Sequence, residues 1–302
     1  MHVQPSAERA KRAKRTLAGA GVALLVALVA GCGEPEAEGD PKLTIYVSAP
    51  LTGPAATEGQ DAVDGAKLAL ADAGGEAGGI EVTAEYLDVA GRNESRSDPV
   101  TAARNARQAT EDSTSIAYIG ELDSATSRTS VPITNSAGIL QVAPGSGASD
   151  LVVEETFDDS VPEEIQGTGE RTFARVLPSD ELVKDELGGD VISGPANPKN
   201  LPDAGKEMLD RFEDEHGRNP GPWVAYGYEA MASTLAAIDR AKDPLSRSSV
   251  VTTYFDGTER ESVLGPYSIT EEGETTLEEP LASYIVTPDG EVVGVPPLGL
   301  KK

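Results

Sequence analysis

The sequence predicts an α/β fold built on a parallel β-sheet. Segments with the pattern of strands alternate at short intervals with segments that have the pattern of helices, so the chain is expected to form βαβ units with right-handed crossovers. Aromatic residues make up only 4% of the 302 residues, whereas glycine occurs 32 times. This composition suits closely packed α/β layers better than an aromatic-rich β-sandwich. The length permits one large domain or two small ones.

The first half of the chain carries the clearest pattern. Residues 42–47 predict the first strand, and Val63, Ala66 and Leu70 then recur at helical spacing. Asp98 and Pro99 supply an N-cap and a first-turn proline for another helix. Further strands are expected at 80–86, 115–119 and 139–142, and a further helix at 123–136. This order predicts a sheet whose strands are joined by helices.

The second half is less regular. An acidic stretch at 154–170 has no apolar periodicity, and residues 171–176 and 190–193 predict short strands. Helices are expected at 202–215, 223–241 and 246–254, and short strands return after residue 262.

Ligands of parallel α/β sheets bind beyond the carboxyl ends of the strands. Three loops are expected at that edge, and all three are rich in Gly, Ser and Thr. They span residues 48–59, 120–124 and 143–150. Backbone N–H groups and small hydroxyls are therefore expected to face a crevice there.

The N-terminus has the pattern of an export signal. A basic stretch precedes an apolar run from Leu17 to Ala30, which is shorter than the ~20 residues that span a bilayer. Cys32 follows this run and resembles the lipidated cysteine of the bacterial lipobox. The alternative is an ordinary export signal with an incidental cysteine. We expect residues 1–31 to be a lipoprotein signal peptide, residues 32–41 a flexible tether, and the protein to be lipid-anchored on the extracytoplasmic side of a bacterial membrane.

The net charge argues against some classes of partner, and the cysteine content argues against a disulfide. The formal net charge is −26, which repels nucleic acid and anionic lipid headgroups. Cys32 is the single cysteine, so no disulfide forms within one chain and the core must be held by apolar packing.

Several motifs occur in an order that resembles one known family. They are Pro50-Leu51-Thr52-Gly53-Pro54, Asp98-Pro99, Tyr118-Ile119-Gly120, Phe173-Ala174-Arg175 and Tyr226-Gly227-Tyr228-Glu229-Ala230. Together they resemble type I periplasmic solute-binding proteins, the leucine/isoleucine/valine receptors of ABC importers. The resemblance covers most of residues 43–180 and 188–290. It implies a Rossmann-like lobe that binds a small amino acid-like ligand and a possible ABC permease as partner.

The sequence departs from this family in its second lobe. Proteins of the family have two α/β lobes hinged about a cleft, but here only residues 181–187 separate the segments that flank the second lobe. An independent domain usually needs at least ~50 residues. We therefore expect a first lobe at 42–150 and 188–260, with a reduced second lobe at 151–187 and 261–302. The family's ammonium-anchoring carboxylate of the second lobe has no position here. Dimerisation would rebuild a cleft, and a deletion in the gene model would produce the same gap.

The resemblance places ligand contacts on Ser124, Ser146 and Gly147. Ser124 is expected to start a helix, where unpaired N–H groups and the positive end of the dipole favour a carboxylate. The alternative is that Ser124 is only an N-cap. The family often has a threonine where Gly147 stands, so Ser146 would supply both the hydroxyl and the backbone group. In the first loop, Glu58 would oppose an anionic ligand, or would hold an ammonium group.

Other polar residues have simpler explanations. Tyr226 is expected to pack in the core, Glu229 to be a helix-surface carboxylate, and His216 to be a solvated group next to the helix stop Gly217. No metal-spaced cluster, phosphate loop or Ser-His-Asp set occurs, so neither a cofactor nor a metal is expected, nor an enzyme.

Two functions remain. The first is a solute-binding lipoprotein of the branched-chain amino acid importer type. The alternative is a single-lobe lipoprotein that has lost tight ligand binding and acts as an interaction or sensor module.

Overall fold

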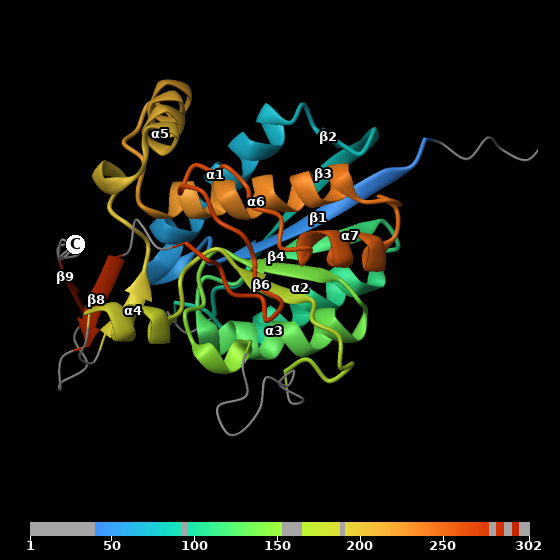
Figure 1. Ribbon diagram of the computed structural model, residues 1–302, viewed down its shortest axis with the longest axis horizontal. Helices are drawn as coiled ribbons and strands as arrows, with labels where there is room; N and C mark the ends of the chain where they lie inside the picture. The colour runs from blue at the N-terminus through green and yellow to red at the C-terminus, as the bar shows by residue number, and fades with distance from the viewer. Residues whose placement is uncertain are drawn as a thin grey trace, which may run out of the picture. The chain divides into compact units, whose positions relative to one another are not determined.

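The computed structural model describes residues 40–91, 96–152, 165–187, 191–277, 282–286 and 292–295. Its main element is a six-stranded sheet with the order β2-β3-β1-β4-β5-β6, in which only β2 is antiparallel to its neighbour (Figure 1). The strands are β1 (Lys42–Ala49), β2 (Glu76–Ala77), β3 (Ile80–Asp88), β4 (Ser115–Ile119), β5 (Leu140–Ala143) and β6 (Phe173–Arg175). The predicted α/β class with a mostly parallel sheet is confirmed.

Helices cover both faces of this sheet (Figure 1). One face is covered by α1 (Ala56–Asp72), α6 (Trp223–Arg240) and α7 (Arg247–Tyr254), and the other by α2 (Pro99–Glu111) and α3 (Ser124–Ser136). Successive side chains of a strand point to opposite faces. Accordingly, Ile45 lies in the core below α1 and α6, whereas Tyr46 packs with Ala106 of α2.

The helices α1 and α6 approach each other closely because each has a glycine at the contact. A Cβ atom on Gly65 would lie 2.0 Å from the carbonyl oxygen of Val224, and one on Gly227 would lie 2.0 Å from that of Ala62. No side chain fits into either gap. The family-like motif Tyr226-Gly227-Tyr228 therefore has a packing role on this helix.

The expected helix ends are present. Asp98 caps α2 by accepting a hydrogen bond from the Thr101 N–H, with Pro99 as the first helical residue. The helix α5 (Asp203–His216) ends at Gly217, whose φ of 64° and ψ of 22° are left-handed. A left-handed C-cap favours glycine, because the Cβ atom of any other residue is strained in this conformation.

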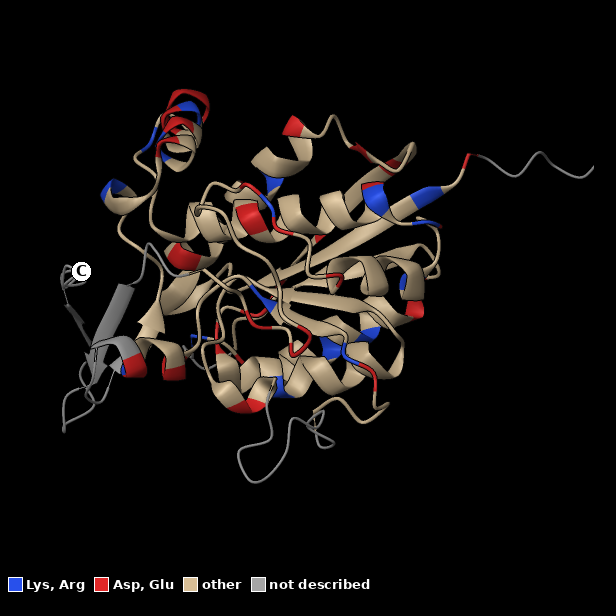
Figure 2. Cartoon of the chain, viewed as in Figure 1, with Lys and Arg blue, Asp and Glu red and all other residues tan. Residues whose placement is uncertain are grey.

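A second, three-stranded sheet is antiparallel and joins distant parts of the chain. Its strands are β7 (Val191–Gly194), β8 (Ala282–Val286) and β9 (Val292–Val295), in the order β7-β8-β9. The seven residues expected to be a short connection belong to α4 (Asp180–Leu187). The exposed face of α5 carries charges of both signs, as Figure 2 shows.

Three segments pair or pack across the boundaries of the expected lobes. The strand β6 belongs to the large sheet, where buried Phe173 and Ala174 lie beside β5. In the same way Leu264, Tyr267 and Leu277 join the large core. Conversely, β7 was expected in the first lobe but pairs with β8. The described residues from 40 onward form one compact unit, and the division into two lobes stays a prediction.

Among the described residues, no helix is long and apolar enough to span a membrane. The predicted signal peptide, the tether up to residue 39 and Cys32 lie outside the described residues.

Candidate ligand-binding site at the carboxyl ends of the strands

The loops that follow β4 and β5 meet at the carboxyl edge of the large sheet. A Cβ atom on Gly145 would lie 2.3 Å from the carbonyl oxygen of Leu122, so the two loops are in direct contact. The Ser124 Oγ accepts a hydrogen bond of 3.1 Å from the Ala148 N–H. The structure thus brings Ser124, Ser146 and Gly147 together, as expected.

Ser124 is the first residue of α3, but it is not the cap. The N-cap is Asp123, whose Oδ1 accepts a hydrogen bond of 3.0 Å from the Thr126 N–H. The alternative role of Ser124 as an N-cap is therefore wrong. The reason is that Asp123 and Ser124 are both good capping residues in adjacent positions, and the carboxylate takes the cap.

Several donors at this edge remain unused. Within the described part of the chain, the backbone N–H groups of Ser124, Ala125 and Gly147 have no acceptor. The first N–H groups of a helix have no partner inside the helix, and the helix dipole adds positive potential there. The Ser124 hydroxyl accepts a hydrogen bond, so its own proton remains free to be donated. This donor set matches an anionic group, although the Asp123 carboxylate beside it reduces the attraction.

Ser146 serves the loop itself. Its side chain is 2% exposed, and its backbone has a φ of 70°, which is unusual for a residue other than glycine. The Ser146 Oγ lies 2.7 Å from the Ser127 Oγ and donates to the carbonyl oxygen of Glu121 at 3.1 Å. Its predicted contact with a ligand stays a prediction, and in this structure the hydroxyl holds the two loops together.

Arg175 of β6 holds the same loop through its guanidinium group. Its side chain is fully buried, and Nη1 donates hydrogen bonds of 2.7 Å to the carbonyl oxygens of both Ser146 and Ala148. Nε and Nη2 donate to the two carboxylate oxygens of Glu274. Arg175 had no predicted role beyond its place in a family-like motif, although an arginine in an apolar strand indicates a buried ion pair.

Gly147 is covered by another part of the chain. A Cβ atom there would lie 2.1 Å from the Ser193 Oγ and 2.3 Å from the Asp180 Oδ1. Asp180 begins α4 and accepts hydrogen bonds from the N–H and the hydroxyl of Ser193, at 2.7 and 2.8 Å. The start of α4 and the strand β7 therefore lie directly against the predicted site.

Glu121 is a buried carboxyl group that the sequence did not reveal. It is fully buried in the β4–α3 loop, and its carboxyl oxygens accept hydrogen bonds from Tyr118 Oη at 2.7 Å and Ser48 Oγ at 3.0 Å. Burial raises the pKa of Glu121 to about 8. Asn105 of α2 extends this network with a 3.1 Å hydrogen bond to Ser48 Oγ. The network ties the predicted ligand loop to β1 and to α2.

The remaining predicted polar residues have partners within the chain. Glu58 forms an ion pair with Arg96. Tyr226 is buried and accepts a hydrogen bond from the Ala196 N–H, as a core residue does. Glu229, expected on the helix surface, is instead buried, and it accepts a 2.7 Å hydrogen bond from Tyr267 Oη. Burial raises the pKa of Glu229 to about 7.

His216 is the last residue of α5. It is exposed to solvent, and its ring stacks on Phe212 at a centroid distance of 4.2 Å. In the part of the chain that the structure describes, no group of three or more His, Cys, Asp or Glu residues has a geometry that would hold a metal ion.

Comparisons with known proteins agree with this architecture. Residues 42–163 match the family model described as periplasmic binding protein. None of the curated protein sequences compared with the chain matches it.

Solved structures share the fold at low sequence identity. A leucine-binding protein from Thermotoga maritima is 18% identical, with a TM-score of 0.58 over 84% of this chain and 98% of that one. A branched-chain amino acid transporter substrate-binding protein from Streptococcus pneumoniae, solved with isoleucine, is 15% identical, with a TM-score of 0.57 over 84% and 99%. A solute-binding protein from Rhodopseudomonas palustris, solved with 3,4-dihydroxybenzoic acid, is 14% identical, with a TM-score of 0.59 over 85% and 97%.

Proposed function

We infer that this chain, a type I periplasmic binding protein by its fold, binds a small amino acid-like solute outside the cytoplasm and delivers it to an ABC permease. The unused N–H groups of Ser124, Ala125 and Gly147 at the carboxyl edge of the sheet carry this proposal. The role is one of binding, without catalysis.

The donor set favours a carboxylate as the group that is held. Charge-assisted hydrogen bonds contribute roughly 1.5–3 kcal/mol each. The ligands bound in two of the structural relatives, isoleucine and 3,4-dihydroxybenzoic acid, both carry a carboxylate, as does the leucine bound in a substrate-binding protein from Desulfitobacterium hafniense with the same fold. The chemistry shared by these ligands supports an acid as the ligand of this chain, and the family resemblance supports an amino acid.

We expect the affinity to be low. The small second sheet leaves most of a zwitterionic ligand in water, and Asp123 places a negative charge beside the carboxylate position. Asp180 and Ser193 also cover Gly147 and would have to yield to a ligand there. Losing two or three charge-assisted contacts moves a micromolar dissociation constant to about millimolar.

Calorimetry with residues 33–302 tests the proposal. Leucine, isoleucine, valine and other amino acids are titrated into the wild type, Ser124→Ala and Ser136→Ala. Ser136 is an exposed serine at the other end of α3 and serves as the matched control. Weak binding that Ser124→Ala reduces by about tenfold and Ser136→Ala leaves unchanged supports the site. Binding that both variants retain in full places the ligand elsewhere.

The lipid anchor is a separate part of the proposal. The apolar run followed by Cys32 supports diacylglyceryl attachment at this thiol, and attachment at the extracytoplasmic face of the membrane. Two acyl chains anchor a protein stably, whereas one chain does so only marginally. Detergent partitioning with intact-mass analysis of the wild type and Cys32→Ser tests this. A mature N-terminus at another residue, without added lipid mass, would contradict the proposed lipid anchor at Cys32.

A further inference from the structure

The loop that carries Ser124 also contains a buried carboxyl group for which the proposed function gives no use. Glu121 precedes Ser124 in this loop, and its side chain is fully buried. Its carboxyl oxygens accept hydrogen bonds from the hydroxyls of Tyr118 and Ser48, at 2.7 and 3.0 Å. No lysine or arginine of the described residues forms an ion pair with it. Such a carboxyl group favours its neutral form, because burial penalises the charged form.

The partners of the Glu121 carboxyl group suit both of its protonation states. A hydroxyl group can donate a hydrogen bond or accept one, so Tyr118 and Ser48 can donate to the carboxylate, and either can accept from the protonated carboxyl group. Asn105 of α2 supplies a further donor to Ser48 Oγ at 3.1 Å. Burial also raises the pKa of Tyr118 well above its usual value, so this hydroxyl keeps its proton while Glu121 titrates. One proton can therefore leave Glu121 without breaking up the network.

The backbone of Glu121 holds both loops of the candidate site. Its carbonyl oxygen accepts a 3.1 Å hydrogen bond from Ser146 Oγ, and its N–H donates to Ser127 Oγ at 3.4 Å. The two serine oxygens lie 2.7 Å from each other. The buried carboxyl group thus belongs to the residue that fixes Ser146 and the first turn of α3.

Negative charge at the start of α3 acts on Glu121. Burial raises the pKa of Glu121 to about 8, and the Asp123 carboxylate adds to this rise, whereas the hydrogen bond from Tyr118 opposes it. Asp123 is the N-cap of α3, and the unused N–H groups of Ser124 and Ala125 lie at the same helix end. A ligand carboxylate bound there places a second negative charge beside Asp123. This charge is expected to favour protonated Glu121, as the charge of Asp123 does.

We propose that ligand binding is linked to a proton on Glu121: the ligand carboxylate binds best while Glu121 is protonated, and at alkaline pH its binding draws a proton onto Glu121 from solution. The inference rests on the proposed function, because it concerns a carboxylate at the N–H groups of Ser124 and Ala125. At pH 6.5 Glu121 holds its proton with or without the ligand, so the affinity is constant there. Above pH 8 the free protein has lost this proton, and the ligand then binds beside an additional negative charge. The affinity therefore falls as the pH rises.

The size of the effect follows from the electrostatics. Two charges about 10 Å apart change each other's pKa by about one unit at an effective dielectric constant of ~20. For a linkage of this size, the ligand is expected to bind about threefold more weakly at pH 8.5 than at pH 6.5. Binding at pH 8 is expected to take up about 0.4 proton per ligand.

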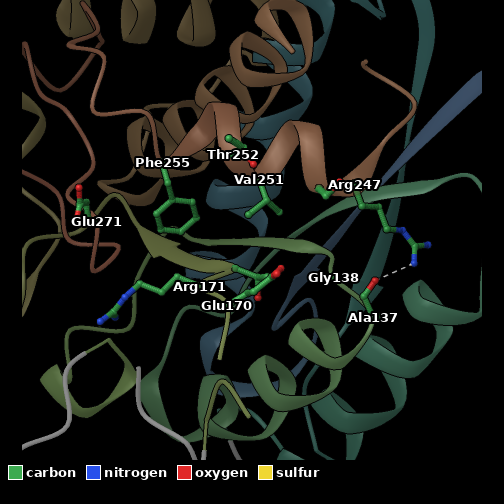
Figure 3. A pocket seen from close by; sticks show the side chains of 11 residues that line it. Ala137, Gly138, Glu170, Arg171, Arg247, Val251, Thr252, Phe255 and Glu271 are labelled. Atoms are coloured by element: carbon green, nitrogen blue, oxygen red, sulfur yellow. Dashed lines mark hydrogen bonds between the residues drawn. The ribbon is translucent and has the colours of Figure 1, made fainter. Parts of the chain in front are cut away.

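Two other carboxyl groups provide matched controls. Glu170 lines a pocket of about 600 Å³ at the amino ends of β5 and β6, and it is exposed to solvent (Figure 3). Glu229 of α6 is buried like Glu121, but its hydrogen bond comes from Tyr267 and not from the ligand loops. Glu170→Gln therefore changes the net charge alone, and Glu229→Gln removes a buried carboxyl group that is not attached to the site.

Calorimetry of residues 33–302 with leucine at pH 6.5, 8 and 8.5 tests the linkage. These values lie below the pH at which the amino group of free leucine loses its proton. Titrations at pH 8 in phosphate and in Tris, two buffers of different ionisation enthalpy, measure the number of protons taken up. An equal wild-type affinity at pH 6.5 and 8.5 without proton uptake overturns the proposal, and this measurement needs no variant.

Variants assign the proton to Glu121. Glu121→Gln cannot titrate, so once circular dichroism has shown that it folds, we expect the same affinity at the three pH values and no proton uptake. Glu170→Gln and Glu229→Gln are expected to keep the wild-type pH profile. A pH profile that Glu121→Gln retains, or that Glu229→Gln also removes, overturns the proposal.

The outcome also separates the linkage from the proposed function. Leucine binding that depends on Ser124 but not on pH contradicts the linkage and leaves the proposed function standing. Absence of leucine binding at pH 6.5, where the linkage predicts the highest affinity, contradicts both.

Discussion

Arg175 Nη1 donates a 2.7 Å hydrogen bond to the carbonyl oxygen of Ser146, a residue whose backbone has a positive φ. This contact joins the end of β6 to the loop that carries the predicted ligand residues. The same nitrogen also donates to the carbonyl oxygen of Ala148, so one buried cation sets the direction of the two peptide groups that follow Ser146 and Ala148. The shape of the site therefore depends on a residue that does not face a ligand.

Replacing Arg175 by methionine is expected to lower the free energy of unfolding by about 3 kcal/mol. The substitution leaves two carbonyl oxygens and the Glu274 carboxylate without their donor, and breaking a buried ion pair is costly. Urea unfolding measures the loss. Arg211→Met is the control, because its ion pair with Asp72 is half-exposed and such pairs contribute at most about 1 kcal/mol. Equal effects of the two substitutions would contradict the role of Arg175.

The buried Glu121 is expected to make the protein less stable as the pH rises from about 4.5 to about 8. Its pKa is raised to about 8 by burial, so over this window the unfolded chain has released a proton that the folded chain still holds. The free energy of unfolding then falls with a slope of up to about 1.4 kcal/mol per pH unit. Below the window both states are protonated, and above it both are ionised, so the slope from this group vanishes.

Glu121→Gln is expected to flatten this decline, because glutamine stays neutral in both states. Glu229, with its pKa raised to about 7, contributes a slope of the same sign that ends near that pH. Urea unfolding of the wild type and the variant at pH 5, 6.5 and 8 measures the difference. A wild-type stability that rises between pH 5 and 8 would contradict the buried state of Glu121.

The cap of α3 is tested by two neighbouring substitutions. Asp123→Ala is expected to lower the free energy of unfolding by about 1 kcal/mol, the usual cost of losing an N-cap. Ser124→Ala removes one hydrogen bond to the Ala148 N–H and is expected to cost less. Thermal or urea unfolding measures the loss of stability in each variant. A larger loss for Ser124→Ala than for Asp123→Ala would show that Ser124 is the cap.

The close contact between α1 and α6 predicts that Gly227→Ala destabilises the protein, whereas helix propensity alone predicts that it stabilises it. Gly227→Ala would gain roughly 0.5–1 kcal/mol if only propensity mattered. In this structure the added Cβ atom overlaps the carbonyl oxygen of Ala62, so we expect a net loss of about 1–3 kcal/mol, as in overpacked cores. Calorimetric unfolding distinguishes a gain from a loss.

The sequence predicted local features well and long-range ones poorly. Strand and helix periodicity, the Asp98-Pro99 start and the Gly217 stop are encoded within a few residues, so the α/β class and most element positions could be predicted. The burial of Glu121 and Glu229 depends on residues that are distant in sequence, such as Ser48 and Tyr267, and so could not be inferred.

The candidate site shows the same limit. The resemblance to a known family brought Ser124, Ser146 and Gly147 to one place, because strand order fixes which loops meet at an edge. It gave no information about the hydrogen bonds from Arg175 to the loop, or about the packing of Asp180 and Ser193 against Gly147. These contacts come from segments whose pairing, such as β7 with β8, joins residues almost a hundred positions apart.

Amide NMR of residues 33–302 tests the central claim most directly, because it observes the unused N–H groups themselves. On titration with leucine, isoleucine or valine we predict saturable shifts of the Ser124, Ala125 and Gly147 amide signals, with a dissociation constant of about 1 mM. Unchanged signals of these three amides, while any amino acid binds elsewhere on the protein or none binds, would contradict the proposed site. A micromolar dissociation constant for a demonstrated monomer would contradict the low affinity that we attribute to the small second sheet.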